Sequence, residues 1–72
     1  MHLHRKSLLT KKEIVVLYLV GDGLSNQEIC HVLQLSDSTV RTHLRHIFSK
    51  LGARSRSHAV SLASKQNILE PK

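Results

Sequence analysis

Hydrophobic residues recur along this chain at helical spacing, in segments separated by short polar or glycine-containing stretches. Thr10 and Glu13 form a T-x-x-E capping box, which predicts a helix that begins at Lys11 and ends in the Gly-Asp-Gly stretch at 21–23. The interior, IVVLYLV, is rich in β-branched residues and by propensity could form a strand. We expect a helix, because no second strand-like segment is available to pair with it. In such a helix Glu13, Val16, Leu17 and Val20 fall at i, i+3, i+4 and i+7, the spacing of one helical face.

Two further helices are predicted in close succession. Ser25 and Glu28 form a second capping box, so a helix should begin at Asn26 and end near Gln34. Ser36 is the expected N-cap of a longer helix over about 37–51, which Gly52 should end. The inward residues of the shorter helix would be Ile29, Cys30 and Leu33. A short helix, a tight turn and a longer helix are the plan of a helix-turn-helix.

The helix expected at 37–51 combines an apolar stripe with a face that lacks acids. At 100° per residue, the stripe of Val40, Leu44, Ile47 and Leu51 lies within an arc of about 60°. The opposite pole carries Thr42, Arg45, His46 and Ser49, flanked by Arg41 on one side and by His43 and Lys50 on the other. An ordinary solvated face mixes Glu with its Lys and Arg. This face therefore favours a groove that is rich in phosphates and bases.

A fourth helix is predicted after the basic connector ARSRS at 53–57, with Ser57 as its N-cap. Asn67 should end it in the left-handed conformation, with Ile68 folded back on the last turn. Ala59 and Ala63 are four residues apart, which permits close approach of another helix. The predicted fold class is therefore all-α, a four-helix bundle with a central helix-turn-helix.

Composition and charge limit the classes of partner that the chain could bind. The chain has 72 residues, which allows one domain, and carries 11 Lys and Arg against 5 Asp and Glu, for a formal charge of +6. Such an excess favours a polyanionic partner, nucleic acid first, then an acidic membrane surface or an acidic protein. The single cysteine, Cys30, fits a reducing compartment. No secretory signal or membrane span is visible, so we expect a cytoplasmic protein without a membrane partner.

Catalytic and metal-binding patterns are weak. His43 and His46 are three apart on one predicted helix, and His2 and His4 form H-x-H, but no four-ligand set is visible. Glu28, like Glu13, is explained by its capping box. No phosphate-binding glycine loop, nucleophile elbow or Cys/His pair occurs. We therefore expect no enzymatic activity, no metal and no cofactor.

Several motifs follow one another in a familiar order and spacing: LTKKE..VL, GLSNQEI, LSDSTVRTH, IFSKLG and SRSHAV. They resemble the LuxR-type (FixJ/NarL/GerE) DNA-binding domain over about Leu8 to Leu69. The resemblance implies a four-helix domain of a bacterial transcription regulator, with its third helix in the major groove, that dimerises through its fourth helix. It divides the chain into an N-terminal segment at 1–7, the domain at 8–69 and a tail at 70–72.

The resemblance also implies roles for individual residues and partners. Base reading would fall to Arg41, Thr42, Arg45 and His46. Contact with the DNA backbone, or bracing of the motif, would fall to Ser25, Asn26, Thr39, His43, Ser49, Lys50, Arg54 and Arg56. Pairing of monomers would involve Ala59, Leu62, Ala63 and Gln66. The implied partners are double-stranded DNA and a second copy of the chain, with RNA polymerase as a further candidate.

Two residues depart from the family pattern, and two other functions remain open. Cys30 stands where the family usually has Ala, and Gln34 stands where the turn often has Gly. A left-handed backbone at Gln34 would cost roughly 1 kcal/mol relative to Gly. The alternatives are region four of a sigma factor and, in a different class, a basic helical module that binds an acidic protein. The elements SNQEI and KLGxRSR favour the LuxR type over the sigma factor, and salt-dependent binding to duplex DNA would separate it from the protein-binding module.

Overall fold

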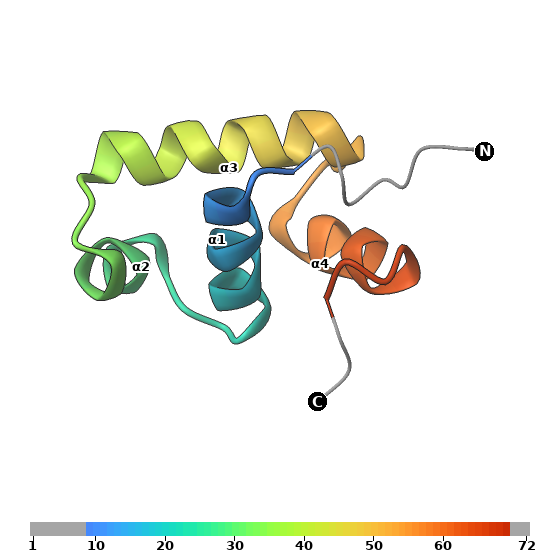
Figure 1. Ribbon diagram of the computed structural model, residues 1–72, viewed down its shortest axis with the longest axis horizontal. Coiled ribbons are helices and arrows are strands. Elements are labelled where there is room, and N and C mark those ends of the chain that lie inside the picture. The colour runs from blue at the N-terminus through green and yellow to red at the C-terminus, as the bar shows by residue number, and fades with distance from the viewer. Residues whose placement is uncertain (1–8, 70–72) are drawn as a thin grey trace.

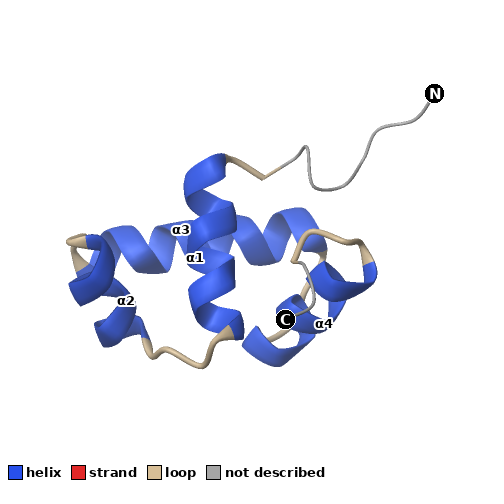
Figure 2. Ribbon diagram, turned by 60° about the horizontal axis from the view of Figure 1, so that its bottom comes forward, coloured by secondary structure: helices blue, strands red, loops and turns tan. Residues whose placement is uncertain are grey.

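Four helices make up the fold in a computed structural model that describes residues 9–69. They are α1 (Lys11–Gly21), α2 (Asn26–Leu33), α3 (Asp37–Leu51) and α4 (Arg56–Lys65). Helix α1 packs across the middle of α3, with α2 toward one end of α3 and α4 toward the other (Figures 1 and 2). Residues 9–69 contain no strand. The predicted all-α bundle with a central helix-turn-helix is confirmed.

Each helix begins at a hydroxyl side chain that accepts a hydrogen bond from a backbone N–H in the first turn. Both predicted capping boxes are present, and Ser36 caps α3 as expected. The predicted cap of the fourth helix is wrong, because Ser55 and not Ser57 accepts from the His58 N–H, at 3.1 Å. Ser57 lies inside α4, and Arg56 is the first residue of the helix rather than part of the connector.

Each helix is followed by a residue with positive φ, which reverses the chain. These residues are Gly23, Gln34, Gly52 and Asn67, with φ values of 92°, 56°, 72° and 60°. In each case the next residue donates its N–H back to the preceding helix, over 2.8–3.1 Å. These next residues are Leu24, Leu35, Ala53 and Ile68, and all four pack against the core. The structure therefore confirms the stops at Gly52 and Asn67, and Gln34 does adopt the strained left-handed conformation.

The core lies where α1, α3 and α4 meet, with Ile29 contributed by α2. Its largest fully buried side chains are Leu17, Ile29, Ile47, Val16 and Val40. The four residues of α1 at i, i+3, i+4 and i+7 (Glu13, Val16, Leu17 and Val20) are all buried. The α3 stripe is buried at Val40, Leu44 and Ile47 and half-buried at Leu51, while Cys30 and Leu33 are half-buried against the core. Burial of the stripe fixes the rotation of α3 and so decides which of its side chains point outward.

Candidate nucleic-acid interface

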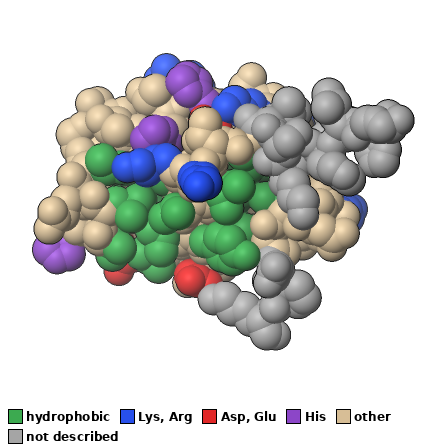
Figure 3. Space-filling model, viewed as in Figure 1, with side chains coloured by type: hydrophobic (Ala, Val, Ile, Leu, Met, Phe, Trp, Pro, Cys, Tyr) green, Lys and Arg blue, Asp and Glu red, His purple; other side chains and the backbone are tan. Residues whose placement is uncertain are grey.

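The outer face of α3 presents basic side chains to solvent. Arg41, Arg45, His46 and Ser49 are exposed. Figure 3 shows Lys, Arg and His side chains gathered on the upper part of one face of the molecule, where α3 runs, with hydrophobic side chains below them. Arg41 forms an exposed i,i+4 ion pair with Asp37, at 2.5 Å. Such a pair contributes only about 0.3–0.5 kcal/mol, so a phosphate can readily replace the carboxylate.

Thr42 and His43 are less accessible than the other candidate residues of α3. Both are half-buried, although the helical wheel placed Thr42 on the pole opposite the core. Thr42 is short, and its neighbours three and four positions away along the helix, among them Arg45 and His46, are longer. A base that contacts Thr42 would therefore have to reach between these longer side chains.

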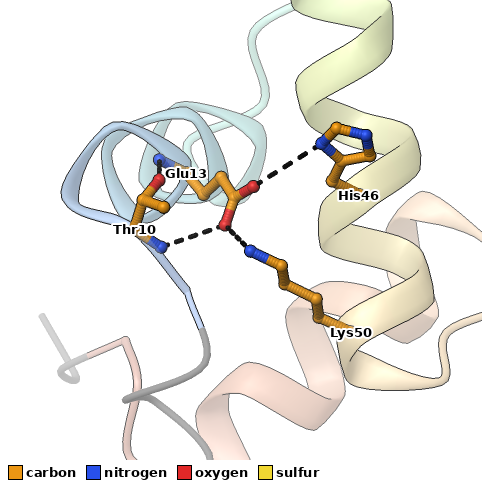
Figure 4. A network of polar contacts seen from close by, with 4 residues as sticks. All are labelled: Thr10, Glu13, His46 and Lys50. Carbon is orange, nitrogen blue, oxygen red and sulfur yellow. Dashed lines mark hydrogen bonds and ion pairs between the residues drawn. The ribbon is translucent and has the colours of Figure 1, made fainter.

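One buried carboxylate joins α1 to the inner edge of this face (Figure 4). Glu13 Oε1 accepts hydrogen bonds from the Thr10 N–H, at 3.0 Å, and from Lys50 Nζ, at 2.7 Å. Glu13 Oε2 lies 4.0 Å from Nδ1 of His46. Sequence reasoning explained Glu13 by its capping box alone and missed both contacts. Lys50 braces α3 against α1 here, and His46, though exposed, has one ring nitrogen turned toward α1.

The pKa of Glu13 lies below its ordinary value of 4.5. Burial raises the pKa, since it disfavours the charged form. Hydrogen bonds from Lys50 and from the Thr10 N–H, together with the charges of Lys50 and His46, lower it by more. The carboxylate is therefore ionised at neutral pH and holds the basic side chains of α3 in place.

A second set of contacts braces the start of α2. Arg56 Nη1 donates to Asn26 Oδ1 at 2.6 Å, and Nη2 donates to the Leu24 carbonyl at 2.7 Å. Ser25 caps α2 by accepting from the Glu28 N–H, at 3.1 Å. These residues hold the helix-turn-helix in shape, whether or not they also contact DNA.

The turn and the connector contribute one further brace and one exposed cation. Thr39 accepts from the hydroxyl of Ser36 at 2.8 Å, which ties the first turn of α3 to its cap. Arg54 is exposed, and its backbone N–H donates to His58 Nδ1 at 3.0 Å. The guanidinium of Arg54 is thus presented to solvent, in contrast to that of Arg56.

The four residues expected to pair monomers fall into two groups. Ala59 and Ala63 are fully buried in the chain's own core, so in this conformation neither can contact a second copy. Their small side chains let α4 approach the rest of the same chain. Leu62 on α4 and Gln66 at its C-cap are half-buried and remain partly accessible.

No group of three or more His, Cys, Asp and Glu side chains within residues 9–69 could hold a metal ion. His2 and His4 lie outside the described residues, as do the predicted segments 1–7 and 70–72. None of the four helices has the length and apolar composition that would let it cross a membrane.

A three-residue turn joins α2 to α3, and the outer face of α3 is basic. Helix α3 is braced from α1, and the start of α2 is braced from α4. This arrangement defines a helix-turn-helix DNA-binding domain. Over residues 7–63 the chain matches the family described as "Bacterial regulatory proteins, luxR family", and it belongs to that family. The LuxR-type resemblance seen in the sequence motifs is confirmed.

The chain is also similar in sequence to individual regulatory proteins. The chain is 43% identical over 61 residues to transcriptional regulatory protein YdfI of Bacillus subtilis (strain 168), covering 85% of this chain and 29% of the relative. It is 43% identical over 60 residues to nitrate/nitrite response regulator protein NarP of Escherichia coli (strain K12), covering 83% of this chain and 28% of NarP.

A solved structure shows the same fold. The crystal structure of response regulator ChrA, from a heme-sensing two-component system, superposes with a TM-score of 0.83 at 41% identity, covering 85% of this chain and 30% of ChrA. The chain thus spans less than a third of the length of each of these three proteins.

Proposed function

We propose that this chain binds double-stranded DNA sequence-specifically, with α3 in the major groove, and that it thereby regulates transcription. The proposal rests on the exposed basic face of α3. The apolar stripe on the other side of this helix is buried, so the basic side chains point toward solvent. Helix α3 has 15 residues, and the B-DNA major groove, about 12 Å wide, admits an α-helix. The comparisons support DNA binding in general, and the major-groove placement rests on the geometry of α3.

We assign base reading first to Arg41 and Arg45, because both side chains are exposed. They lie four apart, so both side chains can meet one groove. Arg can donate two hydrogen bonds to O6 and N7 of guanine, which makes it the best single reader of that base. His46 and Thr42 complete the proposed reading set, with the Thr42 methyl suited to a thymine methyl.

The backbone of DNA would be contacted around this reading set. Arg54 and Ser49 are exposed, and Asn26 lies at the start of α2, the helix that crosses the DNA backbone in helix-turn-helix complexes. Lys50 and Arg56 already have protein partners, so we assign them bracing roles instead. Each phosphate contact should make binding weaker as salt rises.

We also propose that two copies pair through α4 on DNA. Leu62 of α4 and Gln66, the C-cap of that helix, lie four residues apart and are both partly accessible, so a second α4 could contact both. A symmetric pair would place two α3 helices on successive turns of the same face of the duplex. RNA polymerase stays a predicted partner of the bound regulator.

Selection of bound sequences from a random pool of duplex DNA tests these proposals together. We expect one enriched motif in two related copies, separated by about one helical turn, 10–10.5 base pairs from centre to centre. Enrichment of a single copy would refute pairing on DNA and leave base reading intact. Enrichment of no sequence would refute sequence-specific binding and would favour the protein-binding module instead.

A further inference from the structure

Arg56 links the proposed pairing helix to the start of the helix-turn-helix. It is the first residue of α4, and its two terminal nitrogens donate in different directions, to Asn26 Oδ1 at 2.6 Å and to the Leu24 carbonyl at 2.7 Å. These partners lie 30 and 32 residues earlier in the chain. The guanidinium therefore holds together the end of the α1–α2 loop and the first residue of α2.

A cation at the first position of α4 is electrostatically unfavourable. The contacts of Arg56 with Asn26 and Leu24 therefore explain why an Arg occupies this position. The N-terminus of a helix carries a partial positive charge, so a cation in the first turn is disfavoured. The first turn of α4 contains no acidic residue that could offset this repulsion. Both partners of Arg56 are neutral oxygens, and a planar guanidinium is the one side chain whose fork reaches two such acceptors at fixed angles.

The bond to Asn26 has a consequence for the amide nitrogen of that residue. The oxygen and the NH₂ group of an Asn side chain branch from the same amide carbon in different directions, and the two groups have opposite hydrogen-bonding roles. Because Arg56 binds the oxygen, the NH₂ group of Asn26 does not face the Arg56 guanidinium and is left for another acceptor. An NH₂ group in this place, at the start of α2, is a donor suited to a phosphate oxygen.

We propose that Arg56 is a positioning residue that holds the Asn26 amide with its NH₂ group toward a DNA phosphate. This proposal rests on the proposed function, since it assigns α2 to the DNA backbone. Arg56 then contributes to DNA binding through Asn26, without contacting a phosphate itself. It also makes α4 and the start of α2 one hydrogen-bonded unit, so that pairing through α4 fixes where the two Asn26 residues meet the duplex.

Asn26→Asp separates positioning from simple bracing. An Asp at this position keeps the oxygen that Arg56 binds, adds a charge that strengthens that bond, and suits a helix N-terminus. It has no N–H donor and repels phosphate. We expect the thermal midpoint of the free protein to be unchanged or raised, and the affinity for duplex DNA to fall by about tenfold or more. An affinity equal to that of the unmodified protein would overturn the proposal.

Arg56→Ala and Arg54→Ala form a matched pair, because each removes one Arg and one charge two residues apart. The salt dependence of binding distinguishes them, since log K falls with log salt by about 0.9 for each phosphate that a cation neutralises. We expect Arg56→Ala to lower affinity with the slope unchanged and Arg54→Ala to make the slope shallower. A shallower slope for Arg56→Ala would overturn the proposal, because it would mean that the guanidinium contacts a phosphate directly.

The unmodified 72-residue chain, measured in the same titrations, keeps this inference separate from the proposed function. Failure of that chain to bind duplex DNA would refute the proposed function and the inference with it. Binding by that chain together with undiminished binding by Asn26→Asp would refute the inference alone. If Arg56→Ala does not fold, the Asn26→Asp result still decides, because that variant keeps the bond to Arg56.

Discussion

The ion pair between Glu13 and Lys50 predicts an asymmetric response to mutation. The Glu13 side chain is 4% exposed, whereas that of Lys50 is 34% exposed and can turn to water. Lys50→Met keeps most of the aliphatic stem but removes the donor that lies 2.7 Å from Glu13 Oε1. The carboxylate then keeps the Thr10 N–H and the more distant His46, which do not replace the lost charge.

The magnitudes follow from this difference in exposure. Removing one partner of a buried pair typically costs about 3–5 kcal/mol, and the partial exposure of Lys50 places our expectation for Lys50→Met at about 2–3 kcal/mol. Glu13→Gln leaves no buried charge and retains the oxygen that accepts from Thr10, so we expect a cost of about 1 kcal/mol. Combining both changes should cost less than their sum by roughly 1 kcal/mol, since the double variant has no unpaired carboxylate.

Urea unfolding of the four proteins at neutral pH measures these costs. If Lys50→Met costs no more than Glu13→Gln, or if the two costs add, the carboxylate is not a buried partner of Lys50 and the reasoning fails.

The lowered pKa of Glu13 predicts how the stability of the chain depends on pH. The pKa of Glu13 is lowered in the folded chain, so the unfolded chain binds the proton more readily. The stabilisation by Glu13 is therefore complete above its ordinary pKa of 4.5 and is lost as the pH falls through the folded-state pKa. The stability difference between the unmodified chain and Glu13→Gln should shrink as the pH drops below 4.5 and should be constant above it.

Three further predictions concern the fold. Ile47→Ala should cost about 2–4 kcal/mol because Ile47 is fully buried, and Leu51→Ala should cost less because Leu51 is half-buried, as urea unfolding would show. Gln34→Gly should stabilise the chain by about 0.5–1 kcal/mol, since φ at Gln34 is 56°, and a lowered thermal midpoint would contradict this. Ser55→Ala should cost about 1 kcal/mol through loss of the α4 cap, whereas Ser57→Ala should change stability by less than about 0.5 kcal/mol.

The helices could be predicted from sequence because their signals are local. A capping box spans four residues, and the bonds it predicts at Thr10 and Ser25 are present in the structure. The α3 stripe repeats every turn, so its phase could be read directly. The connector ARSRS contains two serines that could cap α4, Ser55 and Ser57. Neither is followed three residues later by the acid that would complete a capping box. The hydrophobic phase of α4 is the same whichever serine caps it, so the pattern could not select Ser55.

The braces of the candidate site could not be predicted, because they join residues far apart in the chain. Lys50 lies 37 positions from Glu13, and the capping box already accounted for Glu13 without it. Arg56 and Asn26 came from the family resemblance as backbone or bracing residues, and only the fold shows that they bind each other. Ala59 likewise fitted a pairing surface by its spacing and is in fact needed inside the chain's own core.

Arg45 provides the most direct test of whether α3 reads DNA sequence. The Arg45 side chain is exposed on the side of α3 away from the core, where it can reach base edges only if α3 lies in the major groove. The measurement is the ratio of affinity for the selected site to affinity for random duplex DNA, for Arg45→Ala and for Arg54→Ala. We expect Arg45→Ala to lower specific affinity by about 1–3 kcal/mol and so reduce the ratio, while Arg54→Ala weakens both kinds of binding alike. An unchanged ratio for Arg45→Ala would contradict the account, because α3 would then bind DNA through charge alone.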